Sequence, residues 1–176
     1  MNFLNHNKID TEKLKLHKSS SNNNLYLFPI KYNKHTIILK TPSLIIPYGI
    51  SKSNYNKEYI TFTFPNIFDK HHIQFYRCLL KIEKWCEVNV NCLIRHINKV
   101  NKNKENYQKI SKRNIKFKKI INTTKYDPTI QMKLSNYIEF FDKNNNKIDK
   151  QEIQAKTNCK TVFYISGIWF NQVTQT

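Results

Sequence analysis

The sequence predicts a mostly β or α+β fold, an OB-like, partly open barrel with one central helix inserted between its strands. Short segments rich in β-branched and aromatic residues fill the first third of the chain. One stretch with helical periodicity follows, and further short apolar segments come after it. This order of strands, helix and strands differs from alternating βαβ units. With only 2 glycines in 176 residues, the chain also lacks a glycine-rich phosphate loop.

The first elements follow a change of texture at residue 25. Residues 1–24 are polar and rich in Asn and Ser at their end, which predicts a mobile tail before one domain over residues 25–176. Residues 25–32, 35–41 and 43–50 are apolar and β-branched, and they predict three short strands.

Residues 58–64 (EYITFTF) form the clearest predicted strand, because side chains of two kinds alternate along it. One face carries Tyr59, Thr61 and Thr63, and the other carries Ile60, Phe62 and Phe64. Pro65 ends the segment.

A helix is predicted next, with Asn66 as its N-cap. Residues at spacings of three and four mark one apolar stripe: Phe68, His72, Phe75, Tyr76, Leu79, Leu80 and Cys86. The pattern weakens between Trp85 and His96, so the sequence leaves the end of the helix open.

The second half predicts more strands, at residues 114–121, 129–135, 137–141 and 160–170. An Asn-rich turn is expected at residues 144–146. Alternation over the last strand places Trp169 with Phe163, Ile165 and Gly167, and Phe170 on the opposite face.

Charge is the main functional signal. Thirty Lys and Arg residues face 12 Asp and Glu, a formal net charge of +18. Such an excess indicates a polyanionic partner, and nucleic acid is the commonest one. The Lys-, Asn- and Ile-rich composition is also typical of an AT-rich genome, and this alternative explains part of the lysine content. Lys far outnumbers Arg, which favours backbone binding with little sequence preference.

Residues 98–126 carry ten basic residues and one acid, Glu105, with aromatic residues between them. Lysines next to exposed rings suit single strands, since every unpaired base offers a face for stacking. The candidate phosphate-binding residues are Lys99, Lys102, Lys104, Lys109, Lys112, Arg113, Lys116, Lys118 and Lys119. Tyr107, Phe117 and Tyr126 are the candidate base platforms. Trp169 is a weaker candidate, because a Trp in an apolar strand is more often part of the core.

Metal binding and catalysis have no matching motif. Residues 142–153 resemble an EF-hand loop, but Lys147 replaces its Gly and Ile153 its final Glu, so a hairpin turn is expected. Cys86 and Cys92 are too far apart for a typical zinc pair. No catalytic signature appears, so the sequence predicts neither an enzyme nor a cofactor, metal or small-molecule substrate.

Three segments carry a resemblance: YDPTIQMKLS (126–135), FFDKNNNKID (140–149) and KTVFYISGIWF (160–170). They resemble the C-terminal half of small single-stranded DNA-binding proteins, with an OB-like core, of large cytoplasmic DNA viruses. The composition, with IIPYGISK (45–52), also resembles proteins of virus-like linear plasmids of yeast cytoplasm. After Trp169 those proteins continue with another aromatic strand, which this chain lacks.

The residues and the resemblance together predict a non-enzymatic, sequence-tolerant single-stranded DNA-binding protein acting in DNA replication. A ribosomal-type RNA-binding protein and a viral genome-packaging or structural protein are the alternatives. No apolar run is long enough to span a membrane, and no secretory signal is evident, so a cytosolic or nuclear location is expected from the residues. The resemblance implies the cytoplasm, at a site of viral or plasmid replication. The sequence leaves a homo-oligomer open.

Overall fold

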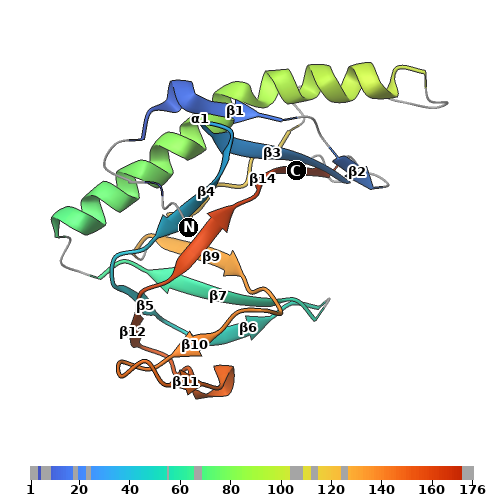
Figure 1. Ribbon diagram of the computed structural model, residues 1–176. Helices are drawn as coiled ribbons and strands as arrows, with labels where there is room; N and C mark the ends of the chain where they lie inside the picture. Colours follow the sequence, from blue (N-terminus) through green and yellow to red (C-terminus); the bar gives the residue numbers. More distant parts are fainter. Residues whose placement is uncertain are drawn as a thin grey trace. The chain divides into compact units, whose positions relative to one another are not determined.

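The computed structural model describes residues 4, 9–17, 20–22, 25–54, 56–65, 69–103, 109–111, 115–123 and 127–171. Over these residues the fold is mostly β with one α-helix, which confirms the predicted class (Figure 1). The described strands form two six-stranded sheets and a two-stranded hairpin, and none of these sheets closes on itself, so an OB-type barrel is not confirmed. The chain divides into two compact units. Unit 1 comprises Met1–Leu39, Arg77–Lys119 and Val162–Thr176, and unit 2 comprises Lys40–Tyr76 and Ile120–Thr161.

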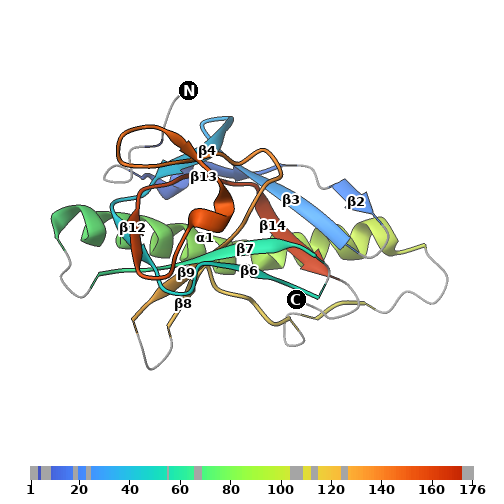
Figure 2. The same ribbon diagram turned by 90° about the horizontal axis from the view of Figure 1, so that it is seen from below.

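Unit 1 contains a sheet organised around one central strand. Its strands are β1 (Leu14–Leu16), β2 (Ser20–Asn22), β3 (Leu25–Tyr32), β4 (His35–Lys40), β13 (Val162–Ile165) and β14 (Gly167–Asn171). The first half of β3 pairs with β2 and β14 (Figure 2). Its second half pairs with β1 and β4, and all four pairings are antiparallel. A short 3-10 helix, Thr11–Lys13, precedes β1. Part of the segment predicted as a mobile tail therefore forms secondary structure.

The core of unit 1 lies on one face of this sheet. Tyr26 and Phe28 of β3 and Phe170 of β14 are buried there. They pack against buried residues of the helix, which are Val90, Leu93, Ile94 and Ile97. Asn101, fully buried, donates a hydrogen bond from Nδ2 to the Tyr26 hydroxyl at 2.6 Å. This contact fixes the end of the helix to the sheet.

The helix α1 (Lys70–Asn101) begins in unit 2, continues in unit 1 and extends beyond the weakening of the apolar pattern. Asp69 caps it, because its carboxylate accepts a hydrogen bond from the His72 backbone N–H at 2.9 Å. That bond is the main reason why the pKa of Asp69 lies below its ordinary value. The predicted cap Asn66, and Phe68, lie outside the described residues.

Most of the predicted apolar stripe faces inward. Its buried members are His72, Phe75, Leu79 and Cys86, and Tyr76 is half-buried. Leu80 is the exception, because it is 38% exposed. It lies at the margin of the apolar face, where periodicity does not decide between core and solvent.

Unit 2 contains the second sheet. Its strands are β5 (Leu44–Ile46), β6 (Ile50–Lys52), β7 (Glu58–Thr63), β8 (Ile121–Asn122), β9 (Thr129–Lys133) and β12 (Thr157–Cys159). The central strand β7 pairs with β5, β6 and β9. Ile60, Phe62 and Phe64 are buried, which confirms the predicted apolar face of this strand.

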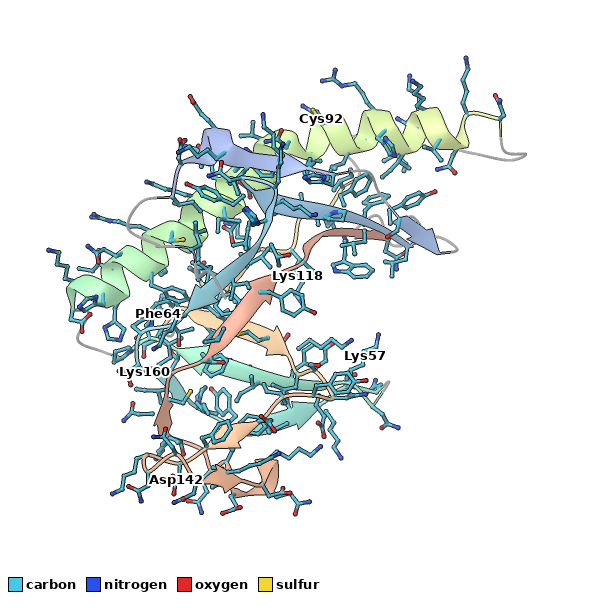
Figure 3. The ribbon with its side chains drawn as sticks, in the orientation of Figure 1. Lys57, Phe64, Cys92, Lys118, Asp142 and Lys160 are labelled. Carbon is cyan, nitrogen blue, oxygen red and sulfur yellow. The ribbon has the colours of Figure 1, made fainter. Side chains whose placement is uncertain are left out.

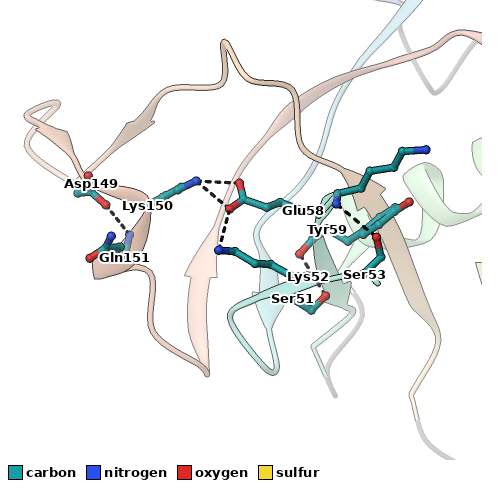
Figure 4. Close-up of polar contacts among 9 residues, drawn as sticks. Ser51, Lys52, Ser53, Glu58, Tyr59, Asp149, Lys150 and Gln151 are labelled. Atoms are coloured by element: carbon teal, nitrogen blue, oxygen red, sulfur yellow. Dashed lines mark hydrogen bonds and ion pairs between the residues drawn. The ribbon is translucent and has the colours of Figure 1, made fainter. Parts of the chain in front are cut away.

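Carboxylates in unit 2 pair with lysines. Glu58 accepts from Lys150 Nζ at 2.8 and 2.9 Å, and Lys52 Nζ lies 4.0 Å from the same carboxylate (Figure 4). A 3-10 helix, Lys150–Glu152, carries the first of these lysines. Part of the positive charge of unit 2 is therefore balanced locally.

The segment that resembles the start of an EF-hand loop forms a hairpin turn, as expected. β10 (Phe140–Phe141) and β11 (Lys147–Ile148) pair around it. The carboxylate of Asp142 accepts hydrogen bonds from the backbone N–H groups of Asn144 and Asn146, both at 2.8 Å. The bonds from Asn146, more than any other contact, hold the pKa of Asp142 below its ordinary value. This carboxylate organises the turn.

Two predicted strands differ in the structure. The strand expected over residues 114–121 is wrong except at its end, because β8 begins only at Ile121. The strand expected over residues 160–170 is interrupted at Ser166. At Gly167, φ is 154°, and a Cβ atom would lie 2.2 Å from the carbonyl oxygen of Phe28. Only glycine permits this close approach.

The interruption inverts the alternation. Before it, Phe163 and Ile165 are half-buried and Tyr164 is exposed. After it, Phe170 is buried with 4% exposure and Trp169 is 53% exposed. The expectation that the Trp side chain is more often core was therefore wrong here.

Candidate nucleic-acid interface

The structure describes eight of the thirteen residues predicted to bind nucleic acid. They are Lys99, Lys102, Lys109, Lys116, Phe117, Lys118, Lys119 and Trp169, and all belong to unit 1. The six lysines are exposed. The other five predicted residues, Lys104, Tyr107, Lys112, Arg113 and Tyr126, lie outside the described residues.

One asparagine of α1 holds Ile110, which lies in the segment between α1 and β8. Asn98 donates from Nδ2 to the carbonyl oxygen of Ile110 at 3.1 Å, and its Oδ1 accepts from the Ile110 N–H at 3.0 Å. Ile110 is buried in the core of unit 1, and Ile115 and Phe117 pack against that core. Phe117 therefore contributes to packing, and its neighbouring lysines, such as Lys118, are exposed to solvent (Figure 3).

Trp169 lies on the other face of the sheet. Phe170 belongs to the core, and successive side chains of a strand point to opposite faces. Trp169 stands directly opposite Leu27 of β3. Phe117 and Trp169 are thus separated by the sheet, and the structure does not bring these two predicted platforms together.

The face that carries Trp169 is here called the open face, and it is formed by Leu25, Leu27 and Lys31 of β3, Lys15 of β1 and Trp169 of β14. Leu25 is 39% exposed, Lys15 is exposed, and Leu27 and Lys31 are half-buried. The open face therefore combines an accessible indole ring with apolar surface and two cationic side chains.

The two lysines of the open face stand directly opposite each other, in register between β1 and β3. Like charges directly opposite each other destabilise a sheet. Among the residues that the structure describes, no carboxylate forms an ion pair with Lys15 or Lys31. This pair was not predicted from the sequence. Alternation alone would have placed each lysine outward, but only the register brings them together.

A second cationic surface follows α1. Basic residues recur on its exposed side at spacings that return to one face of a helix, and Lys102 follows directly after its end. Together they are called the basic stripe: Arg77, Lys81, Lys84, Arg95, Lys99 and Lys102. Two of the three arginines of the chain belong to it. Arg77, Lys81, Lys84 and Arg95 were missed by the sequence analysis, which followed only the apolar face of the helix.

The basic stripe is not neutralised within the described part of the chain. None of the ion pairs found there involves a residue of the stripe. Its basic residues include pairs four apart, such as Arg77 with Lys81, whose repulsion weakens an isolated helix by about 0.2–0.5 kcal/mol. The surface is therefore suited to a polyanion that compensates this repulsion.

Metal ligands, reactive thiols and membrane-spanning helices were also sought among the described residues. They contain no group of three or more His, Cys, Asp and Glu side chains that could hold a metal ion. Burial raises the pKa of Cys78 and Cys159 to about 11 and that of Cys86 to about 12, and Cys92 is exposed. No helix in these ranges has the length and apolar character needed to cross a membrane.

Comparisons with protein-family models, with curated proteins and with solved structures found no match.

Proposed function

We propose that the protein is a non-enzymatic, sequence-tolerant single-stranded DNA-binding protein that acts in DNA replication. The observation that carries this proposal is the open face, where the exposed ring of Trp169 shares one sheet surface with the opposed lysines Lys15 and Lys31. An unpaired base can stack on the indole, and its backbone can run toward the lysines. A duplex keeps its bases inside the helix and cannot use the ring in this way.

The chemistry of the side chains favours weak sequence preference. Stacking on a ring accepts every base, and a lysine acts as a mobile point charge on phosphate. The exposed lysines of the segment before β8, together with the predicted residues outside the described ranges, add phosphate contacts in this proposal. The OB-like core and the cytoplasmic location stay predictions, and the proposal depends on neither.

Replacing Trp169 with Ala tests the proposal most simply. Loss of one stacked base costs about 1–3 kcal/mol, so affinity for oligo(dT) should fall by roughly five- to hundredfold. Tyr137→Ala is the matched control, because Tyr137 is 93% exposed and belongs to unit 2. Fluorescence anisotropy of a labelled oligonucleotide measures both variants. Equal affinity of the two variants for oligo(dT) would contradict stacking on Trp169.

Salt dependence tests the phosphate contacts. Six neutralised phosphates give a slope of about −4 for log K against log salt on the single-strand coefficient. A slope near zero would exclude lysine–phosphate binding. A competition between DNA and RNA oligomers of one sequence then separates the proposal from the RNA-binding alternative, because only the 2′-hydroxyl distinguishes them at a stacking site.

A further inference from the structure

We propose that the basic stripe of α1 is a second nucleic-acid site, which takes the phosphate backbone of double-stranded DNA. It is distinct from the open face and does not depend on the single-strand proposal. The stripe occupies the side of α1 that points away from the core of unit 1, and the open face lies on the side of the sheet that points away from the same core.

The stripe is long and divided into two basic ends. From Arg77 to Lys99 the helix rises by about 33 Å, at 1.5 Å per residue. The three basic residues at each end are separated by a neutral stretch with Val88, 68% exposed, and the exposed Cys92 (Figure 3). Lys84 and Arg95, which border this stretch, differ by about 16 Å along the axis.

This spacing favours a duplex. The major groove of B-DNA is about 12 Å wide, with a phosphate backbone along each rim. If α1 lies across the groove, the neutral stretch covers the groove, and each basic end can reach one rim through its long side chains. A rigid duplex holds both rims in place, whereas a single strand must be ordered to serve both ends.

Two alternatives explain the basic stripe less well than duplex binding does: contact with a membrane surface, and a solvated helix face without a partner. A helix that lies on a membrane buries its apolar face among the lipids, but the apolar face of α1 is occupied by Tyr26, Phe28 and Phe170. A merely solvated face would be expected to include balancing acids. Glu87 is the only exposed acid on this part of the helix, and it lies about 80° from Arg77 around the axis, beside the stripe.

The test removes three charges from the stripe. In the triple variant R77Q/K84Q/R95Q, Gln keeps helix propensity close to that of Lys and Arg. The control K57Q/K143Q/K160Q removes three exposed lysines of unit 2. The loss of three phosphate contacts should reduce the duplex salt slope by about 2.7, which lowers duplex affinity by roughly a hundredfold at about 0.15 M salt. Anisotropy with a labelled duplex and with oligo(dT) of equal length measures both.

The expected result is loss of duplex binding in the stripe variant, with oligo(dT) affinity unchanged and the control close to the parent protein. Cys92 should also become protected from iodoacetamide when duplex is bound. An unchanged duplex affinity would overturn the inference. If the stripe variant lost affinity equally for duplex and for oligo(dT), the stripe would be part of one common site and the inference would be wrong. If the control variant lost as much duplex affinity as the stripe variant, the effect would come from net charge and not from the stripe. The two proposals stay separately testable. The stripe variant should still bind oligo(dT), and the Trp169→Ala variant should lose that binding.

Discussion

At the scale of single residues, burial separates the four thiols of the chain. The thiolate is the reactive form of cysteine. Burial raises the pKa of Cys78 to about 11 and that of Cys86 to about 12, whereas Cys92 of the same helix is exposed. We therefore expect iodoacetamide near pH 8 to modify Cys92 first and the two buried thiols only after unfolding. Mass spectrometry of digested protein measures the order, and early modification of Cys86 would contradict the assigned buried face of α1.

Single residues also show where sequence reasoning failed. Phe117 was expected to be a platform and Trp169 only a weaker candidate, but Phe117 is half-buried and Trp169 is 53% exposed. Phe117 lies in a charged segment, yet its ring packs against the core of unit 1. Trp169 lies in an apolar strand, yet the interruption at Gly167 changes its face. Both outcomes depend on contacts between residues far apart in the sequence.

At the scale of elements, the interruption between β13 and β14 sets the open face. Gly167→Ala should place a Cβ atom 2.2 Å from the Phe28 carbonyl oxygen. We expect a loss in free energy of unfolding of about 2 kcal/mol or more, from the clash and the strained backbone. Urea unfolding measures it. Gly49→Ala is the control, because its φ of 70° brings only left-handed strain, with the nearest atom at 3.4 Å. An equal cost at the two positions would contradict the close approach.

Elements with a clear period were predictable, and those defined by tertiary contacts were not. Strand β7 and the start of α1 follow from alternation and from the three–four spacing. The sequence left the end of α1 open because Asn89 interrupts the apolar pattern and the apolar Val88 is exposed. The strand expected over residues 114–121 failed because Ile115 and Phe117 serve the core of unit 1. Charged and apolar residues do alternate in this segment, but the part of it before Ile121 that the structure describes pairs with no other strand.

At the scale of the whole molecule, composition predicted a polyanionic partner but not where the charge gathers. Lys15 and Lys31 are far apart in the sequence, and only the pairing of β1 with β3 makes them neighbours. The basic stripe needed the full length of α1, which the sequence left open. In unit 2, Lys150 and Lys52 instead share the carboxylate of Glu58. The candidate sites of unit 1 are therefore products of the fold.

The most direct measurement is the fluorescence of Trp169 in a Trp85→Phe variant, which leaves this indole as the only Trp of the chain. Stacking of a base on the exposed ring should quench its emission as oligo(dT) is added, with a midpoint equal to that of binding and a return at high salt. A duplex should leave the emission unchanged. Binding of oligo(dT) with no change in Trp169 emission would contradict the assignment of the open face as the single-strand site.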